Sequence, residues 1–128
     1  MLNEETKYLK LQKLKNGYEY KESNDAALET LNYFLDDCHA ATNSFKKWMY
    51  DPAIEIFGGN VTTVEKEGEK IIITLEFVEN EKKYDYSFET TREKLIDIMD
   101  RWNELYKKMP EKIIITRYND AIILEGKN

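Results

Sequence analysis

Apolar side chains recur at helical spacing in the first half of the chain. After Asn24 and Asp25, both good N-caps, apolar positions follow at steps of three, four or seven residues and predict a helix over residues 24–50. Pro52 ends this pattern, because the residue before a proline avoids the helical region. The polar run Thr42-Asn43-Ser44 offers an earlier break or kink.

A second helical stripe lies near the carboxyl end. Thr90 and Glu93 fit a capping box, and the apolar positions that follow predict a long helix over residues 91–109, which Pro110 ends. Beyond it, two short runs rich in isoleucine flank Asn119-Asp120 and predict a hairpin over residues 112–125.

Alternating apolar and polar positions mark the middle of the chain. Residues 61–90 contain two turn signals and predict a three-stranded antiparallel meander. With Asn80-Glu81 as a two-residue turn, every inward cross-strand pair is apolar: Ile73 with Phe88, Leu75 with Tyr86, and Phe77 with Tyr84. The same register places two pairs on the opposite face: Glu76 with Asp85, and Thr74 with Ser87.

Residues 1–22 fit two structures. Acidic residues early, Lys13 and Lys15 late, and Asn16-Gly17 as a stop favour a short helix slightly. The alternation around Leu9 and Leu11 before Asn16-Gly17 fits a hairpin almost as well. We therefore predict a single domain over residues 1–128 of the α+β class, a mostly antiparallel sheet with the two long helices packed on one face.

These periodicities also predict the hydrophobic core. Its members are the apolar residues on the inward face of each predicted helix or strand. They are Leu28, Leu31, Leu35, Phe45, Ile73, Leu75, Phe77, Phe88, Leu95, Met99, Trp102, Leu105, Ile115 and Leu124.

Composition and charge narrow the class of protein. The net charge is -6, which argues against a nucleic-acid binder acting through counterion release, and no apolar run reaches the ~20 residues of a membrane span. The amino terminus is acidic and has no apolar stretch of the secretory type. A single cysteine excludes an internal disulfide, so we expect a cytoplasmic protein.

Groups that could carry catalysis are sparse. Cys38 and His39 are adjacent on the predicted helix and therefore point about 100° apart, which favours a buried cysteine beside a rim histidine over a catalytic pair. One cysteine and one histidine cannot fill a tetrahedral metal site, and Gly58-Gly59 is a turn signal rather than a phosphate-binding loop. We expect no enzymatic activity, no metal and no cofactor.

The net negative charge of the chain lies between residues 23 and 93, where acidic residues outnumber Lys and Arg. Glu76 and Asp85 face each other in the predicted register, and like charges directly opposite on a sheet are destabilising unless another group compensates. Either a lysine of the chain or a basic partner could offset the repulsion between these two carboxylates. The alternative is that the acidic residues only form a surface exposed to water. The candidate partner-binding residues are Glu65, Glu76, Glu79, Glu81, Asp85 and Glu89 on the meander, with Asp36 and Asp37 on the first helix.

The order of these elements resembles that of a known class of small acidic proteins. The run from Phe57 to Val61, the meander, the Trp102 helix, Pro110 and the terminal hairpin make residues 24–126 similar to immunity proteins of bacterial polymorphic-toxin and contact-dependent growth inhibition systems. The resemblance implies a protein without catalytic residues that binds a cognate toxin domain in the cytosol, often a nuclease, and blocks its active site or substrate surface. It implies no direct contact with nucleic acid or membrane.

Two functions therefore follow from the sequence. The first is an immunity-type inhibitor, or antitoxin, that neutralises a basic toxin domain through electrostatically steered contact. The alternative is a small ligand-binding or regulatory domain.

Overall fold

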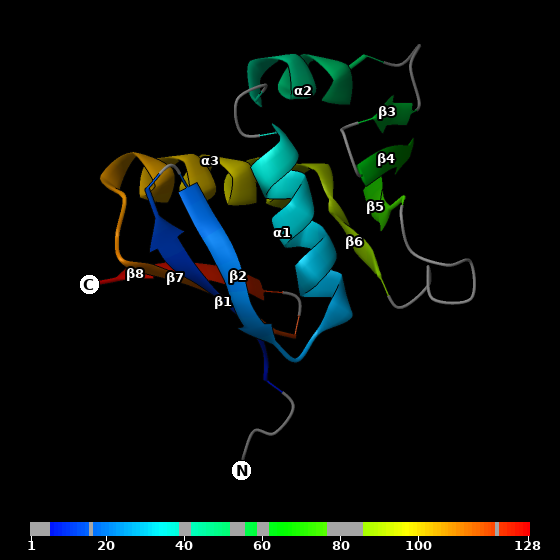
Figure 1. Cartoon of the computed structure of the whole chain (residues 1–128). Helices are drawn as coiled ribbons and strands as arrows, with labels where there is room; N and C mark the ends of the chain where they lie inside the picture. Colours follow the sequence, from blue (N-terminus) through cyan, green and yellow to red (C-terminus); the bar gives the residue numbers. More distant parts are fainter. Residues whose placement is uncertain are drawn as a thin grey trace.

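Eight strands and three helices make up the described part of the chain (Figure 1). The computed structural model describes residues 6–15, 17–38, 42–51, 56–58, 62–76, 86–119 and 121–128, with only the backbone described for residues 37, 38, 42 and 56–58. In chain order the elements are β1 (Lys7–Leu14), β2 (Gly17–Ser23), α1 (Ala26–Cys38), α2 (Thr42–Met49), β3 (Ile56–Gly58), β4 (Thr62–Glu67), β5 (Lys70–Leu75), β6 (Ser87–Thr91), α3 (Arg92–Lys108), β7 (Lys112–Tyr118) and β8 (Ala121–Lys127).

The strands form two antiparallel sheets. Sheet A has the order β2-β1-β7-β8 and sheet B the order β3-β4-β5-β6. The α+β class and the antiparallel pairing are confirmed, but the expectation of one sheet is wrong. The reason is that β1 pairs with β7, with Leu9 opposite Ile115, so the C-terminal hairpin continues into the N-terminal hairpin instead of the meander.

Residues 7–23 form a hairpin, so the slight preference for a helix was wrong. Leu9 and Leu11 are buried, as period-two alternation requires, while Lys10 between them is exposed. A strand can satisfy its backbone groups only if neighbours are present. β1 has two, because β2 follows it in the chain and β7 arrives from about a hundred residues later.

The predicted helix over residues 24–50 is two helices. α1 ends at Cys38 and α2 begins at Thr42, so the pattern is divided before the polar run. The predicted break within Thr42-Asn43-Ser44 is wrong, because these residues form the first turn of α2. Their axes differ in Figure 1, where α1 lies between the two sheets and α2 lies above them. The break lets Phe34 of α1 meet Phe45 of α2, with ring centroids 5.0 Å apart.

The start of α3 lies one residue later than predicted. Thr91 is the N-cap, and its hydroxyl accepts a hydrogen bond from the backbone N–H of Lys94 at 3.3 Å. The predicted capping box from Thr90 to Glu93 is therefore wrong, since the residue three positions after the true cap is a lysine. The helix ends at Met109 in the left-handed region, directly before Pro110.

The meander register agrees with the prediction for two pairs, and the described ladder stops before the predicted pair of Leu75 with Tyr86. Ile73 lies opposite Phe88 and Thr74 opposite Ser87. Gly68 turns the chain between β4 and β5 with a positive φ of 65°, which glycine adopts without steric cost. The pairs that involve Phe77, Tyr84 or Asp85 lie outside the described residues. β3 was not predicted and pairs with the free edge of β4.

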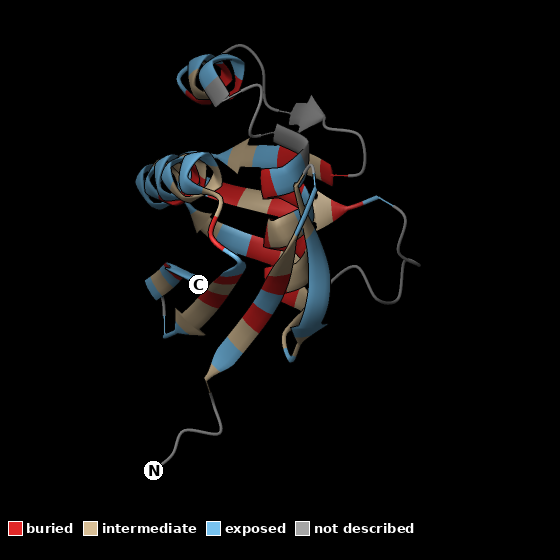
Figure 2. Ribbon diagram, turned by 60° about the vertical axis from the view of Figure 1, so that its left-hand side comes forward, coloured by how far each residue is buried: buried red, intermediate tan, exposed pale blue. Residues whose placement is uncertain are grey.

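One hydrophobic core joins both sheets and all three helices. α1 contacts β1 and β2 of sheet A as well as β4, β5 and β6 of sheet B, and α3 contacts β8 on one side and β5 and β6 on the other. Figure 2 shows buried residues alternating with exposed ones along the strands. The predicted core residues that the structure describes are buried, except Leu105, which packs against the core while partly exposed. The prediction omitted others: Leu9, Leu11, Ala27, Phe34, Trp48, Met49, Val64, Ile71, Ile98 and Ile113.

A lysine on the inward face of β4 holds the end of α2. Lys66 Nζ donates hydrogen bonds to the carbonyl oxygens of Trp48 and Asp51, each at 2.6 Å, and lies 4.4 Å from the centroid of the Trp48 ring. Carbonyls at the end of a helix have no partner within the helix and carry partial negative charge. The Trp48 carbonyl also accepts the N–H of Asp51, and Lys66 adds a charged donor to it and to the Asp51 carbonyl just beyond the helix. These contacts explain a charged residue at a position that the alternation would assign to the core.

Candidate functional site

The outward face of sheet B carries three of the acidic residues that the sequence assigned to partner binding. The register places Ile72 of β5 between Glu65 of β4 and Glu89 of β6, and the neighbouring row holds Thr63, Thr74 and Ser87. Both glutamates are exposed and Ile72 is partly exposed. Since adjacent strands lie about 4.8 Å apart, the two glutamates start roughly 10 Å from each other across the isoleucine. We call this surface, defined by Glu65, Ile72, Glu76 and Glu89, the acidic sheet face.

Two contacts within the chain modify this face. Lys70 Nζ lies 3.4 Å from a carboxylate oxygen of Glu89, with both side chains about half exposed. The Thr63 hydroxyl donates a hydrogen bond to the carboxylate of Glu76, which is itself exposed. Exposed ion pairs contribute only about 0–1 kcal/mol to stability. Lys70 therefore neutralises part of the negative charge of Glu89. The chain would lose little stability from this ion pair if a partner displaced Lys70.

The structure brings together only some of the predicted partner-binding residues. Glu65, Glu76 and Glu89 share the acidic sheet face, as predicted. Glu79, Glu81 and Asp85 lie outside the described residues, and with them the pairing of Glu76 with Asp85. Asp36 is exposed on α1, apart from this face, and the side chain of its neighbour Asp37 is not described.

Two exposed tyrosines on and near α1 were not among the predicted binding residues. Tyr33 lies three residues before Asp36 on α1 and is 41% exposed, and Tyr20 of β2 is 47% exposed. Partial burial and the charge of Glu29 raise the pKa of Tyr20, which places Glu29 near that ring. The high number of tyrosines, nine in the chain, was the signal that could have pointed to them.

The surroundings of Glu29 on α1 disfavour the charged form of its carboxyl group. Partial burial raises the pKa of its carboxyl, and the negative charge of Asp25 raises it further. A carboxyl whose pKa is raised by folding stabilises the protein at low pH, and that contribution is lost as the pH rises through the raised pKa. At neutral pH the charged Glu29 therefore slightly opposes folding, and a nearby cation would relieve this effect.

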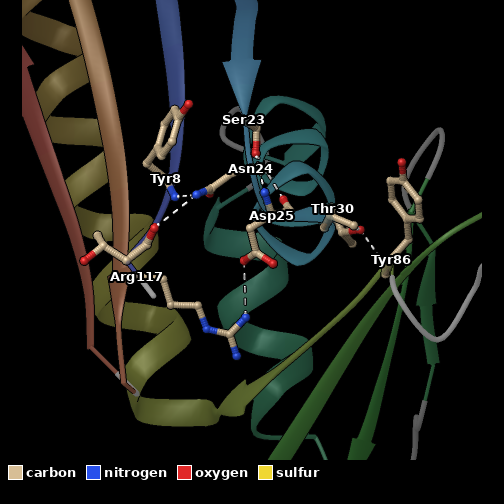
Figure 3. A network of polar contacts seen from close by, with 9 residues as sticks. Tyr8, Ser23, Asn24, Asp25, Thr30, Tyr86 and Arg117 are labelled. Atoms are coloured by element: carbon tan, nitrogen blue, oxygen red, sulfur yellow. Dashed lines mark hydrogen bonds and ion pairs between the residues drawn. The ribbon is translucent and has the colours of Figure 1, made fainter. Parts of the chain in front are cut away.

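A polar network ties the two sheets together around the start of α1 (Figure 3). Asn24 accepts a hydrogen bond from the N–H of Tyr8 on β1 at 2.8 Å. One residue later, Asp25 pairs with Arg117 of β7, whose Nη1 lies 3.5 Å from Oδ2. On the sheet B side, the hydroxyl of Thr30 donates to the backbone oxygen of Tyr86, just before β6. The network thus fixes α1 against both sheets.

Replacing Thr30 with valine is expected to lower the free energy of unfolding by about 1–3 kcal/mol, because the carbonyl of Tyr86 loses its partner in a buried position. Thr30 is fully buried and valine has nearly the same shape, so little packing is lost. Urea denaturation of both proteins measures the difference. Thr90→Val, a partly exposed position on β6, is the matched control. Equal unfolding midpoints for all three proteins would show that the contact contributes nothing.

A cavity of about 250 Å³ lies beside β6, where sheet B meets the end of the β7–β8 hairpin. Its polar lining comes from Lys70, Glu89, Thr90, Thr91, Lys94 and Arg117. A second hollow of about 310 Å³ adjoins it along α3 and shares Thr90 and Lys94. We call the first cavity the β6 groove. None of the sequence predictions included it, because its walls come from three separate parts of the chain.

A metal-binding cluster and a membrane-spanning helix are both absent from the described part of the chain. Within the described ranges, no three His, Cys, Asp or Glu side chains gather closely enough to hold a metal ion. His39 and the side chain of Cys38 lie outside the description. None of the helices in the described part of the chain has the length and apolar character that crossing a bilayer requires.

Comparison with known proteins gives no assignment. No family model matches the sequence, and no curated protein and no solved structure matches the chain.

Proposed function

We propose that this chain is an immunity-type inhibitor that binds a basic toxin domain, such as a nuclease, in the bacterial cytosol and occludes its active site or substrate surface. The observation that carries the proposal is the acidic sheet face, where exposed Glu65 and Glu89 flank the partly exposed Ile72. An apolar residue between two carboxylates suits a lysine or arginine, whose aliphatic stem can lie on the isoleucine while its charge meets a glutamate.

The distribution of charge supports a basic partner. The chain carries a net charge of -6, and the excess of acidic over basic residues lies in the segment that builds α1 and sheet B. Complementary potentials accelerate encounter and exclude partners of like charge. Substrate surfaces of nucleases are basic because they contact phosphates, so an acidic inhibitor could compete with nucleic acid for the same surface.

The side of α1 that carries Tyr33 and Asp36 offers additional contact area. Tyrosine is enriched among residues that dominate binding energy, since it combines a large apolar ring with a hydrogen-bonding hydroxyl. Tyr20 lies on neighbouring β2, and the charged Glu29 nearby would gain from a cation. This surface is where we expect the partner if the acidic sheet face does not bind it.

Charge reversal at the acidic sheet face is expected to weaken binding of the protein encoded by the adjacent gene. The double variant Glu65→Lys/Glu89→Lys should lower the affinity about tenfold or more at low salt, mainly through slower association. The effect should shrink as ionic strength rises, because the screening length falls to about 8 Å at physiological salt. Stopped-flow association and calorimetry at two salt concentrations measure both quantities.

The control variant is Glu104→Lys/Glu125→Lys, which changes the net charge equally but lies on α3 and on sheet A. Both double variants should keep their thermal unfolding midpoints, because exposed substitutions seldom change stability by more than about 0.5 kcal/mol. If both double variants bind the protein encoded by the adjacent gene equally well, the acidic sheet face is only a solvated surface. If neither the unaltered chain nor any variant binds it, the immunity function itself is rejected.

A small ligand-binding domain is the second candidate function. The β6 groove is the observation in its favour, since it is a concave site with several polar groups directed toward one volume.

A further inference from the structure

The β6 groove gathers positive charge in an acidic protein. Lys70 comes from the start of β5, Lys94 from the first turn of α3 and Arg117 from the end of β7. Glu89, which pairs with Lys70, is the single carboxylate among the described residues of the lining. Asp25 pairs with Arg117 from outside the lining. Three cations therefore meet two carboxylates at this cavity, which leaves one positive charge in excess, although the chain as a whole carries a net charge of -6.

Arg117 is held in a defined position at this cavity. Its guanidinium lies 3.5 Å from Asp25 and 5.7 Å from the centroid of the Phe88 ring, and about a third of the side chain is exposed. A guanidinium carries five N–H donors in one plane, and the hydrogen bond that Arg117 donates to Asp25 uses the nitrogen Nη1. An arginine that is fixed on one side and open on the other suits bidentate recognition of a phosphate or carboxylate.

Lys94 lies where its own helix disfavours a cation. It is the third residue of α3, and the amino-terminal end of a helix carries partial positive charge. A cation in the first turn opposes the helix dipole, whereas acidic residues there are stabilising. Its backbone N–H is bound by the Thr91 hydroxyl, so the helix end itself is capped without a ligand. A bound anion would offset the unfavourable position of the ammonium group.

The dimensions of the groove limit what it can hold. A volume of about 250 Å³ lies just below the range of about 300–1,000 Å³ that is usual for sites of drug-sized ligands. Phe88 and Ile122 supply the apolar part of its lining. The groove therefore suits a small molecule with a charged end and a short carbon skeleton.

We infer that the β6 groove binds a small anionic molecule with phosphate or carboxylate groups, held between Arg117, Lys94 and Lys70. This inference goes beyond the proposed inhibitor function and does not depend on it. The same groups could recognise a phosphate or a polycarboxylate, so the chemistry they share is a compact oxyanion with more than one negative charge.

The test is a titration of the full chain with inorganic phosphate and, separately, with citrate, at constant ionic strength. Amide shifts in a two-dimensional NMR spectrum should change saturably at Thr90, Thr91, Lys94 and Arg117. Lys94→Gln should raise the dissociation constant about tenfold, as expected for the loss of one charge-assisted contact. Lys70→Gln provides an independent second variant, and both positions are exposed, so the fold should remain intact.

Lys108→Gln is the matched control, because it removes the same charge at the opposite end of α3. It should bind both anions as the unaltered chain does. Tighter binding of phosphate would identify a phosphorylated ligand, and tighter binding of citrate a polycarboxylate. The inference is overturned if neither anion shifts these amides saturably, if both groove variants bind like the unaltered chain, or if Lys108→Gln weakens binding equally.

Discussion

Phe34→Ala is expected to lower the free energy of unfolding by about 3–5 kcal/mol, a large part of the 5–15 kcal/mol that stabilises a domain of this size. Phe34 is fully buried, and its ring meets that of Phe45 edge-on at 5.0 Å across the break between α1 and α2. Truncation leaves a cavity at the point where the two helices join the common core. Urea denaturation followed by circular dichroism measures the loss.

Tyr33→Ala on the same helix is the matched control for this experiment. Tyr33 precedes Phe34 directly, but its side chain is 41% exposed, so its loss should cost much less. Both substitutions remove an aromatic ring from α1 and change helix propensity similarly. If the two variants unfold at the same urea concentration, the packing of α1 against α2 differs from that described here.

Leu9→Ala is expected to cost about 2–5 kcal/mol, because Leu9 is fully buried and lies at the centre of sheet A. It pairs with Ile115 of β7 on one side and with Ser23 of β2 on the other. The loss should therefore loosen both hairpins together. Hydrogen exchange at the amides of β7, compared between the unaltered chain and the variant, measures that coupling.

The control for Leu9→Ala is Lys10→Ala, the next residue of β1, whose side chain is exposed on the other face of sheet A. It should leave both the unfolding midpoint and the exchange rates in β7 nearly unchanged. A Leu9→Ala protein that unfolds like the control would show that the N-terminal hairpin contributes nothing to the core. The helix that the sequence slightly favoured for this segment would then be the better description.

The spacing of apolar residues predicted the secondary structure wherever it fitted only a helix or only a strand. The spacing of apolar residues identified α3, and Pro110 marked its end. The alternation around Ile73 placed Phe88 opposite it, because a slip of one residue would turn every inward side chain outward. The polar run from Thr42 did not identify the division between α1 and α2, because it lies inside α2 and α1 already ends at Cys38.

Sequence patterns also located part of the candidate interface. Outward positions on strands follow from the same alternation as inward ones, so Glu65 and Glu89 could be assigned to one face. Tyr33 on α1 was not found, because an aromatic residue at helical spacing reads equally well as core. Only burial distinguishes Phe34, which is enclosed, from its neighbour Tyr33, which is not.

The sequence by itself therefore determined the apolar stripes of α1 and α3, the register of β5 with β6 and the acidic residues on the outward face of sheet B, since these depend on residues a few positions apart. Tertiary structure alone decided the rest. Residues 7–23 became a hairpin because β7 supplies a distant neighbour for β1, and that pairing divided the strands into two sheets. Lys66 became an inward residue because α2 ends beside it, and Lys70, Lys94 and Arg117 meet only because sheet B adjoins the β7–β8 hairpin. Such contacts join residues far apart in the chain, and the local period of apolar residues carries no information about them.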